Sequence, residues 1–362
     1  MTLLRHSYSY YLRIYFFPFF FRMFFRVRKP RRAVAPFKSV LFLRPGKLGD
    51  ITVATPIFAL IKKYLPTVHI AVACAESNNV MVQHHPHIDE MINLNFHRIP
   101  SLLKLIRLMR KRAYDMVVDL SPGMSSTNFF VLQLGGRRSI LVGCDKELQE
   151  PFYDMPLRMG RIHIIDQNIA IAEALLGQRV ARPVRPFIAT APEHKIQAQA
   201  LWQAHFKPHD FVIGVNCSAG SDNRQLSREQ YGSILRGIRQ VPHLAHCPIL
   251  LFAVQQQRLW AQQYAQELRQ TVLIPECSVL TVYELISKLG LLVSPDTSLI
   301  HFASAHGVPV VGMFSTHWQN AVRWAPYYVP HKIVLSPDEW GITRVDCAAV
   351  VRAVAELATE LM

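Results

Sequence analysis

The sequence predicts an α/β protein built from two doubly wound domains that face each other across a cleft. Three observations support this prediction. Strand-like apolar runs alternate with helix-periodic segments over most of the chain, a pattern typical of βαβ units and of a parallel sheet covered on both faces. Three prolines in the stretch 182–192 interrupt the alternation, which then begins again. The 362 residues are also enough for two domains with separate cores.

A basic and aromatic extension at residues 1–36 precedes the first domain, which we expect to span residues 37–185. Runs of consecutive apolar residues predict buried parallel strands, and apolar residues three or four positions apart predict amphipathic helices. The expected strands are Val40–Leu43, His69–Ala75, Met91–Leu94, Met116–Leu120 and Ile140–Gly143. The expected helices are Pro56–Tyr64, Pro100–Arg112, Ser126–Leu134 and Asp166–Leu176.

The second domain is expected to span residues 186–362, and the same two patterns predict its elements. The expected strands are Phe211–Asn216, Ile249–Ala253, Leu291–Ser294 and Val308–Phe314. The expected helices are Glu193–His205, Arg228–Arg239, Arg258–Gln270, Val282–Leu289, Leu299–His306 and Cys347–Leu361.

The net charge of +15 is confined to the first half of the chain. Residues 1–36 carry +8, residues 37–185 carry +7, and residues 186–362 carry thirteen charges of each sign. Such a field concerns partners rather than fold, so we expect the first half to meet something anionic. Six cysteines lie far apart in the sequence, without zinc or redox spacing, which favours a reduced cytoplasmic setting.

The extension mixes eleven aromatic residues with eight arginines and lysines over residues 1–32. A membrane-spanning helix needs about 20 predominantly apolar residues, whereas Arg13, Pro18 and Arg22 interrupt this run. The segment ends in a basic cluster rather than in the cleavage site of a signal peptide. We expect an interfacial anchor, with aromatic rings at the headgroup level and arginines on anionic lipid. A disordered extension is the alternative.

The first candidate site follows the strand that begins near Leu41. Ligands in open α/β sheets bind beyond the carboxyl ends of the strands, and the loop at this position carries Arg44, Lys47 and Asp50. Asp50 has two interpretations. It can cap the helix that follows, or it can be a proton acceptor whose ionised form the nearby cations favour. Thr55-Pro56 is itself a good helix start, which would leave Asp50 in the loop.

A second candidate loop follows the strand that ends near Ser294. Backbone N–H groups at a helix start, aided by the helix dipole, can hold a phosphate or pyrophosphate. Thr297 and Ser298 add hydroxyl groups, and His301 lies one turn further along the helix. The alternative is that Asp296 or Thr297 only caps the helix.

A third candidate loop, Asn216–Arg224, also follows an apolar strand. Its small residues let the backbone approach an anion closely, and Arg224 offers a bidentate fork for phosphate. Alone this is an ordinary polar loop, but three strand-terminal loops with complementary chemistry favour a binding site for a phosphorylated ligand.

Several other functions lack their sequence signals. Neither G-x-G-x-x-G nor the P-loop pattern is present, which argues against a nicotinamide or flavin oxidoreductase. The uncharged second half and the lack of a recognised motif argue against nucleic-acid binding. His84, His85 and His87 surround a proline without partner ligands, so we expect no metal site.

Three motifs occur in the order found in a known family. RPGKLGDITVATP, the Ser-Ala-Gly loop before Arg224, and SPDTSLIHFASAHGVPVVGMF together resemble glycosyltransferase family nine, the ADP-heptose:lipopolysaccharide heptosyltransferases, over roughly residues 38–362. The resemblance implies a GT-B fold, in which two Rossmann-like domains bind the acceptor and the nucleotide sugar respectively. It implies inverting, metal-independent transfer of a heptosyl unit from ADP-heptose to the anionic lipopolysaccharide core, with no cofactor. It also implies a cytoplasmic enzyme, peripheral on the cytoplasmic face of the inner membrane.

The resemblance assigns roles by position. It makes Asp50 the general base and places Arg44, Lys47 and Gly49 in a loop facing the acceptor and the sugar. The residues that it implies for nucleotide-sugar binding are Ser218, Ala219, Gly220, Arg224, Gln257, Asp296, Thr297, Ser298 and His301.

Three places in the sequence depart from the family pattern. Ala219-Gly220 replaces the hydroxyl pair found in some members. Ser298 stands where the family usually has glycine, and glutamines occupy 255–257, where many members have an acidic residue near the nucleoside. A glutamine can still hydrogen-bond a ribose, but without the assistance of a charge. A transferase using another nucleotide sugar or acceptor, or a non-catalytic binding protein on this fold, is therefore the alternative.

Overall fold

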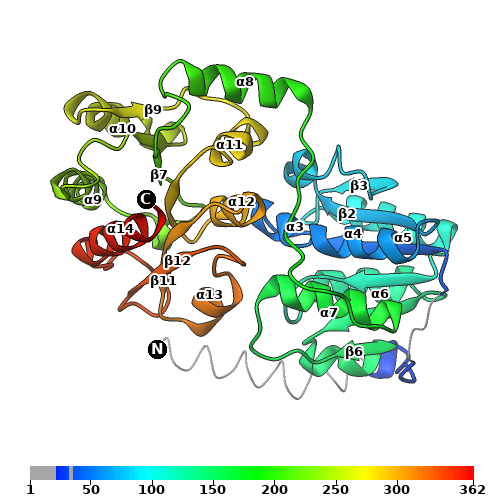
Figure 1. Cartoon of the computed structure of the whole chain (residues 1–362). Coiled ribbons are helices and arrows are strands. Elements are labelled where there is room, and N and C mark those ends of the chain that lie inside the picture. Colours follow the sequence, from blue (N-terminus) through cyan, green and yellow to red (C-terminus); the bar gives the residue numbers. More distant parts are fainter. Residues whose placement is uncertain (1–21, 32–35) are drawn as a thin grey trace. The chain divides into compact units, whose positions relative to one another are not determined.

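The computed structural model describes residues 22–31 and 36–362, and Figure 1 shows its helices and strands. The chain divides into two compact units. The first comprises Met1–Gly160 with Asp166–Arg182, and the second comprises Arg161–Ile165 with Pro183–Met362. Residues 183–191 contain neither helix nor strand. Most of the proposed anchor, residues 1–21, lies outside the described residues.

The first unit contains a six-stranded parallel sheet with the order β3-β2-β1-β4-β5-β6. Its strands are β1 (Ser39–Arg44), β2 (His69–Ala75), β3 (Glu90–Leu94), β4 (Met116–Asp119), β5 (Ile140–Cys144) and β6 (Met155–Leu157). This order is that of a doubly wound sheet, so the predicted fold class is confirmed for this unit. The sequence did not predict β6, because its three residues include a proline and are too few to show a strand pattern.

Successive side chains of a strand point to opposite faces of the sheet. The central strand β1 is apolar at successive positions, so both faces of the sheet are apolar and helices cover both. Leu41 and Leu43 belong to the core cluster formed with the helices α5 and α6, whereas Phe42 packs edge-on against Phe58 of α4 at 5.3 Å. The helices are α3 (Leu48–Thr52), α4 (Thr55–Tyr64), η2 (Glu76–Met81), α5 (Ile99–Arg112), α6 (Ser126–Gly135), η3 (Glu147–Phe152) and α7 (Ile164–Leu176).

The second unit repeats the same order in a sheet β12-β11-β10-β7-β8-β9, again parallel throughout. Its strands are β7 (Ile213–Asn216), β8 (Ile249–Phe252), β9 (Thr271–Leu273), β10 (Leu291–Pro295), β11 (Val310–Ser315) and β12 (His331–Ser336). The edge strands β9 and β12 were not predicted. One has only three residues, and the other begins with His331 and Lys332, which do not read as a buried run.

The second unit's helices are α8 (Pro192–Gln203), η4 (Asp222–Arg224), α9 (Arg228–Gln240), α10 (Gln255–Glu267), α11 (Val279–Ile286), α12 (Ser298–His306), α13 (Trp318–Arg323) and α14 (Cys347–Leu361). Side chains of α9, α10 and α14 share one core cluster with the sheet. Both α10 and α11 begin three residues before their predicted starts. For α11 the reason is Ser278, whose hydroxyl caps the helix by accepting from the Thr281 backbone N–H.

Each sheet reverses its winding beside its first strand, between β1 and β4 and between β7 and β10. The loops that leave these strands diverge to opposite faces, and the crevice that opens there is the usual ligand site of an open α/β sheet. The three candidate loops follow β1, β7 and β10, so all three lie at these switch points.

The described residues bear on two features of the chain, a membrane-spanning helix and a group of metal ligands. None of their helices has the length and apolar character needed to cross a membrane. Nor do they contain a group of three or more histidine, cysteine or acidic side chains that could hold a metal ion.

His85 makes the stability of the first unit depend on pH. The imidazole is buried, and burial, aided by the nearby His87, lowers its pKa from 6.5 to about 4. The neutral form therefore stabilises the folded state fully above pH 6.5, and this stabilisation is lost as the pH falls towards 4. The difference corresponds to at most about 3 kcal/mol. We expect urea titrations of His85→Gln to show a shallower loss of stability between pH 7 and pH 4 than the wild type. An equal decrease in the free energy of unfolding between pH 7 and pH 4 in both proteins would contradict this assignment.

Candidate active site

Asp50 lies in a short helix rather than in a free loop. The helix α3 begins at Leu48, and Asp50 is its third residue, so the loop predicted to extend through Asp50 ends at Lys47. The carboxylate atom Oδ2 accepts a hydrogen bond of 2.5 Å from the Lys47 backbone N–H. Asp50 therefore satisfies the start of α3 in the manner of a capping box. Asp50 is therefore not the N-cap of the helix that follows it, as the first interpretation expected, but the third residue of α3, whose N-cap is Lys47. Its other carboxylate oxygen is left to a second partner.

That second partner is Arg44, the last residue of β1. Its Nη2 donates to Asp50 Oδ1 at 2.9 Å, and its Nε donates to the Asp50 backbone oxygen at 3.0 Å. The Arg44 side chain is 1% exposed, whereas that of Asp50 is 22% exposed. Arg44 thus binds the carboxylate from its buried side, and Asp50 is the member of the pair that solvent reaches.

Gly46 leaves room for this arrangement. A Cβ atom at Gly46 would collide with the carboxylate of Asp50, and the Gly46 carbonyl accepts from the side-chain amide of Asn78. The backbone at Gly46 is therefore fixed on one side and pressed against Asp50 on the other. The exposed Lys47 ends the loop, and the partly exposed Gly49 lies in the first turn of α3.

Burial lowers the pKa of the Arg44 guanidinium from its usual value, while the carboxylates of Asp50 and Asp119 act in the opposite direction. Arg44 also donates to the Leu120 carbonyl at the end of β4. One buried cation therefore joins the two sides of the switch point. It is better described as a positioning residue for Asp50 than as the loop residue facing the acceptor that the sequence suggested.

A buried ion pair that the sequence analysis missed lies beside Arg44. The ammonium of Lys146 is 2.9 Å from Asp119 Oδ2, and both side chains are 0% exposed. Lys146 also donates to the carbonyls of Ser121 and Gly123 at 2.7 and 2.8 Å, and Asp119 accepts from Asn128 at 2.9 Å. These bonds hold the loop after β4. The negative and positive side chains alternate in the order Asp50, Arg44, Asp119 and Lys146. The position of Asp119 at the end of an apolar strand was the available signal.

In the second unit, Asn216 joins two of the candidate loops. Its Nδ2 donates to Ser294 Oγ and to Thr297 Oγ1, each at 3.0 Å, and its Oδ1 accepts from the Ser218 backbone N–H at 3.1 Å. The loops after β7 and β10 are therefore one structure. Asn216 was noted only as the start of its loop, and its bridging role could not be predicted without knowing which strands are neighbours.

The small loop after β7 is tightly hydrogen-bonded. Ser218 is 9% exposed, and its Oγ accepts from the Val254 backbone N–H at 2.9 Å, which fixes the start of α10. The Ala219 N–H donates to Gln225 Oε1 at 2.8 Å. Gly220 follows at the exposed end of this turn. The loop is consequently rigid rather than an ordinary mobile surface turn.

Arg224 and Asp296 form the charged part of this site. Arg224 Nη1 lies 3.1 Å from Asp296 Oδ2 and donates to the Asp296 backbone oxygen at 3.0 Å. The Arg224 side chain is 35% exposed and that of Asp296 is 8% exposed. Asp296 therefore orients a guanidinium that an incoming anion can still reach. This pairing adds a positioning role to the direct nucleotide contact predicted for Asp296.

The start of α12 lies next to this pair. Thr297 is its N-cap residue in an extended conformation, and Ser298 is its first residue, both partly exposed. The first N–H groups of a helix have no intrahelical acceptors, and with the helix dipole they attract an anion. His301, one turn along, is 3% exposed, and its ring lies 5.8 Å from that of Trp324. His301 is therefore a buried wall of the site rather than an exposed group.

Gln257 lies in the first turn of α10, at the same edge of the sheet. Its side-chain oxygen Oε1 is buried and accepts no hydrogen bond from the residues that the structure describes. An unsatisfied buried acceptor is costly, and a ligand hydroxyl could satisfy it.

The predicted residues thus fall into two sets, each within one unit. The first unit brings together Asp50, Arg44, Lys47 and Gly49 after β1. The second unit brings together Ser218, Ala219, Gly220, Arg224, Gln257, Asp296, Thr297, Ser298 and His301 after β7, β8 and β10. The first set can accept a proton, and the second can hold an anion.

Two Rossmann-like units, each with such a set at its switch point, are the architecture of the GT-B fold. The chain belongs to glycosyltransferase family 9 (heptosyltransferase), whose sequence model matches residues 102–349. This match includes both anion-binding loops of the second unit and begins after Asp50.

Individual proteins agree with this assignment. The chain is 22% identical to the lipopolysaccharide core heptosyltransferase OpsX of Haemophilus influenzae over 302 residues, which is 80% of this chain and 82% of that protein. A family 9 glycosyltransferase structure from Veillonella parvula has a TM-score of 0.75 at 19% identity, covering 91% of this chain and 99% of the other. The structure of E. coli heptosyltransferase WaaC with ADP has a TM-score of 0.67 at 15% identity, covering 89% and 99%. At these identities the two structural comparisons establish the fold.

Proposed function

We propose that this glycosyltransferase moves a heptosyl unit from ADP-heptose to the inner core of lipopolysaccharide, with inversion at the anomeric carbon and without a metal ion. The observation that carries the proposal is the division of chemistry between the units. The first holds a partly exposed carboxylate on a buried arginine, and the second holds an arginine beside a helix start. The names of OpsX and of the WaaC–ADP complex support the choice of acceptor and nucleotide.

On the acceptor side, Asp50 would take the proton of the attacking hydroxyl as that oxygen bonds to the anomeric carbon. The Lys47 N–H and Arg44 fix the carboxylate in one orientation before the acceptor arrives. A fixed base avoids the reorganisation that a free carboxylate would undergo during the reaction.

On the donor side, departure of ADP leaves new negative charge on the β-phosphate. Arg224 and the N–H groups at the start of α12 would stabilise this charge, with Lys47 as a second cation. Gln257 Oε1 would accept a hydrogen bond from a ribose hydroxyl. All of these donors and acceptors are groups of the protein chain, and the proposed transfer uses no metal ion.

The charge distribution supports an anionic acceptor at a membrane. Residues 1–36 and 37–185 carry the whole net charge of +15, and the inner core presents phosphates and carboxylates. We therefore place the enzyme in the cytoplasm, peripheral on the cytoplasmic face of the inner membrane, with residues 1–36 at the lipid surface.

A thermal-shift panel of ADP, UDP, GDP and their sugars tests the donor assignment. A ligand present at 100 times its Kd stabilises the protein by about 2.7 kcal/mol, so ADP and ADP-heptose should raise the melting temperature far more than the uridine and guanosine ligands. Stabilisation by UDP but not by ADP would contradict the heptosyl assignment and leave a transferase that uses another nucleotide sugar.

Arg224→Ala should lose most of the stabilisation by ADP and lower kcat by about 10²–10³-fold, because it removes one donor to the departing phosphate. Arg224→Lys keeps the charge but loses the bidentate guanidinium, so its stabilisation by ADP and its kcat should lie between those of the wild type and Arg224→Ala. The matched control is Arg228→Ala, an exposed arginine four residues further along. Equal ADP binding by Arg224→Ala and Arg228→Ala would remove Arg224 from the diphosphate site.

A further inference from the structure

Residues 24–31 form a strap that packs against the first unit. The backbone N–H of Arg28 donates to the Pro151 carbonyl at 2.9 Å, and that of Arg31 donates to the Asp154 carbonyl at 2.7 Å. The ring of Phe25 meets that of Phe129 edge-on at 5.5 Å. This part of the basic extension is therefore attached to the fold through both backbone and side chains.

Arg28 ties the strap to the turn between α6 and β5. Its guanidinium donates to the carbonyls of Gly136 and Ser139 at 2.9 and 2.8 Å, and it pairs with Asp154 at 2.5 Å. The Arg28 side chain is 13% exposed. Because these bonds use the charge of Arg28, it belongs to the framework of the surface and not to its free cations.

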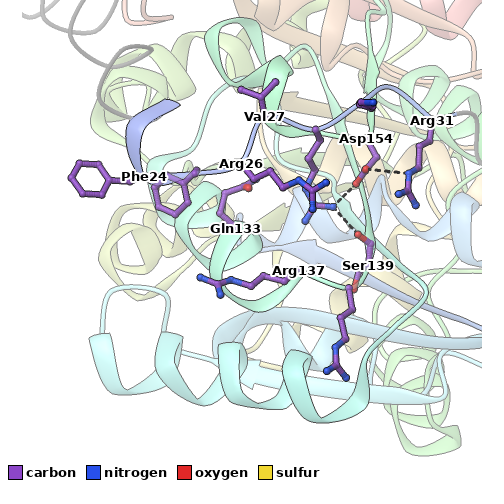
Figure 2. Close-up of a pocket in the computed structure, with 12 residues that line it drawn as sticks. Phe24, Arg26, Val27, Arg31, Gln133, Arg137, Ser139 and Asp154 are labelled. Atoms are coloured by element: carbon purple, nitrogen blue, oxygen red, sulfur yellow. Dashed lines mark hydrogen bonds and ion pairs between the residues drawn. The ribbon is translucent and has the colours of Figure 1, made fainter.

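Strap and turn together enclose a cavity of about 600 Å³ (Figure 2). The residues lining the cavity are Phe24, Phe25, Arg26, Val27, Arg28, Lys29, Arg31, Gln133, Arg137, Arg138, Ser139 and Asp154. Six of these side chains are cationic and one is acidic. Asp154 is already neutralised by Arg28 at 2.5 Å and approached by Arg31 at 3.8 Å.

Four exposed cations of this cavity, Arg26, Lys29, Arg137 and Arg138, face no further acidic residue among those that line it. A second cavity of about 280 Å³ shares Arg137, Arg138 and Ser139 and adds Arg110. The basic surface therefore continues from the strap across the turn to α5. Several guanidinium groups around one cavity fit phosphate oxygens.

Apolar side chains accompany these cations, from Phe24 and Val27 of the strap and from Met23 directly before it. Met23 is 64% exposed, Phe24 is 60% exposed and Val27 is 47% exposed. Figure 2 shows Phe24 at one end of the cavity and Asp154 with Arg31 at the other. Large apolar groups beside a cationic cavity fit the boundary between lipid headgroups and acyl chains better than they fit a soluble anion.

The cavity is not part of the candidate active site. Ser139 and Asp154 directly precede β5 and β6, so the cavity lies where these strands begin, whereas Asp50 follows the end of β1. Because the strands are parallel, the beginnings of β5 and β6 and the end of β1 lie on opposite sides of the sheet along the strand direction.

We propose that this cavity binds the phosphate headgroup of an anionic phospholipid while Met23, Phe24 and Val27 enter the interfacial layer. Basic residues supply the attraction to the charged surface, and the apolar side chains add the second signal that stable anchoring requires. The proposal rests on the membrane-surface part of the proposed function and is independent of the transfer chemistry.

The test is sedimentation of the full chain with vesicles of phosphatidylcholine alone or mixed with phosphatidylglycerol. The wild type should bind the mixed vesicles more tightly. Arg137→Gln with Arg138→Gln should weaken this binding by about 30-fold, because each basic residue near an anionic surface contributes about 1 kcal/mol. Both arginines are exposed and lie outside the extension, so the double variant separates the cavity from residues 1–21.

Lys195→Gln with Arg269→Gln is the matched control, since it removes the same charge from exposed positions of the second unit. Equal losses in both double variants, unchanged binding by Arg137→Gln/Arg138→Gln, or no preference of the wild type for the mixed vesicles would each overturn the proposal. Glycerol 1-phosphate supplies the soluble phosphate. If it stabilises the wild type in a thermal-shift assay while neither vesicle binds, the cavity is a site for a free phosphate ester instead. Turnover with a water-soluble acceptor should be the same in both double variants, which keeps this test separate from that of the proposed function.

Discussion

Asp50→Asn should lower kcat by about 10²–10⁴-fold while the affinity for the donor nucleotide stays near that of the wild type. The asparagine retains the size of the side chain and one acceptor oxygen for the Lys47 N–H, but it cannot accept the proton of the attacking hydroxyl. The nucleotide-binding residues belong to the other unit, so the loss should appear in kcat and not in the binding of ADP. Steady-state kinetics combined with ADP titration separate the two effects.

The double role of Asp50 requires a control for structure, because it also pairs with Arg44. Asp115 is a suitable match. Its carboxylate accepts from the backbone N–H groups of Lys38 and Ser39 at 2.7 and 3.0 Å, at the opposite end of β1. Asp115→Asn therefore removes a similar capping carboxylate away from the candidate site and should leave turnover unchanged. If Asp50→Asn stays folded and turns over at a near-normal rate, Asp50 is a structural cap only.

Lys146→Met should lower the free energy of unfolding of the first unit by about 3–5 kcal/mol. The methionine fills much of the same volume but leaves the carboxylate of Asp119 buried without its cation. It also removes the donors to the Ser121 and Gly123 carbonyls, which hold the loop after β4. Hydrogen exchange of the β4 and β5 amides can measure this loss in the first unit alone, since two-unit proteins need not unfold in a single step.

A second variant distinguishes a lost ion pair from a damaged core. Lys146→Met combined with Asp119→Leu removes both charges, and replacing a buried pair by apolar residues is often neutral or stabilising. The double variant should therefore recover a large part of the stability lost by Lys146→Met. No recovery, or a loss below about 1 kcal/mol in the single variant, would contradict the assigned role of the pair.

The sequence was sufficient to predict the arrangement of strands that positions the site. Short apolar runs such as the one after His69 favour central parallel strands when helical segments alternate with them, and the structure places β2 at the predicted residues His69–Ala75. The polar loops after such strands then had to lie at one edge of a sheet, which is how the loops after β1, β7 and β10 were found. The closing helix Cys347–Leu361 was predicted with its observed bounds because of its long amphipathic pattern.

The failures have a common physical cause, which is that tertiary contacts override weak local signals. The five residues of α3 are too few to show a helical period, and the helix is stabilised by the contacts of Asp50 with Lys47 and Arg44. The pair of Asp119 with Lys146 joins residues 27 positions apart and depends on the neighbouring strands β4 and β5. Likewise, Asn216 acquires its role only because β7 and β10 are adjacent.

The most direct measurement incubates the purified full chain with ADP-heptose and a lipopolysaccharide core acceptor, and follows ADP release together with the mass of the acceptor. Our account predicts that the acceptor gains one heptosyl residue for each ADP released, in the presence of a metal chelator, and that Asp50→Asn abolishes both signals at matched enzyme concentration. An unchanged acceptor with intact ADP-heptose would contradict it, and so would equal transfer by the Asp50→Asn variant.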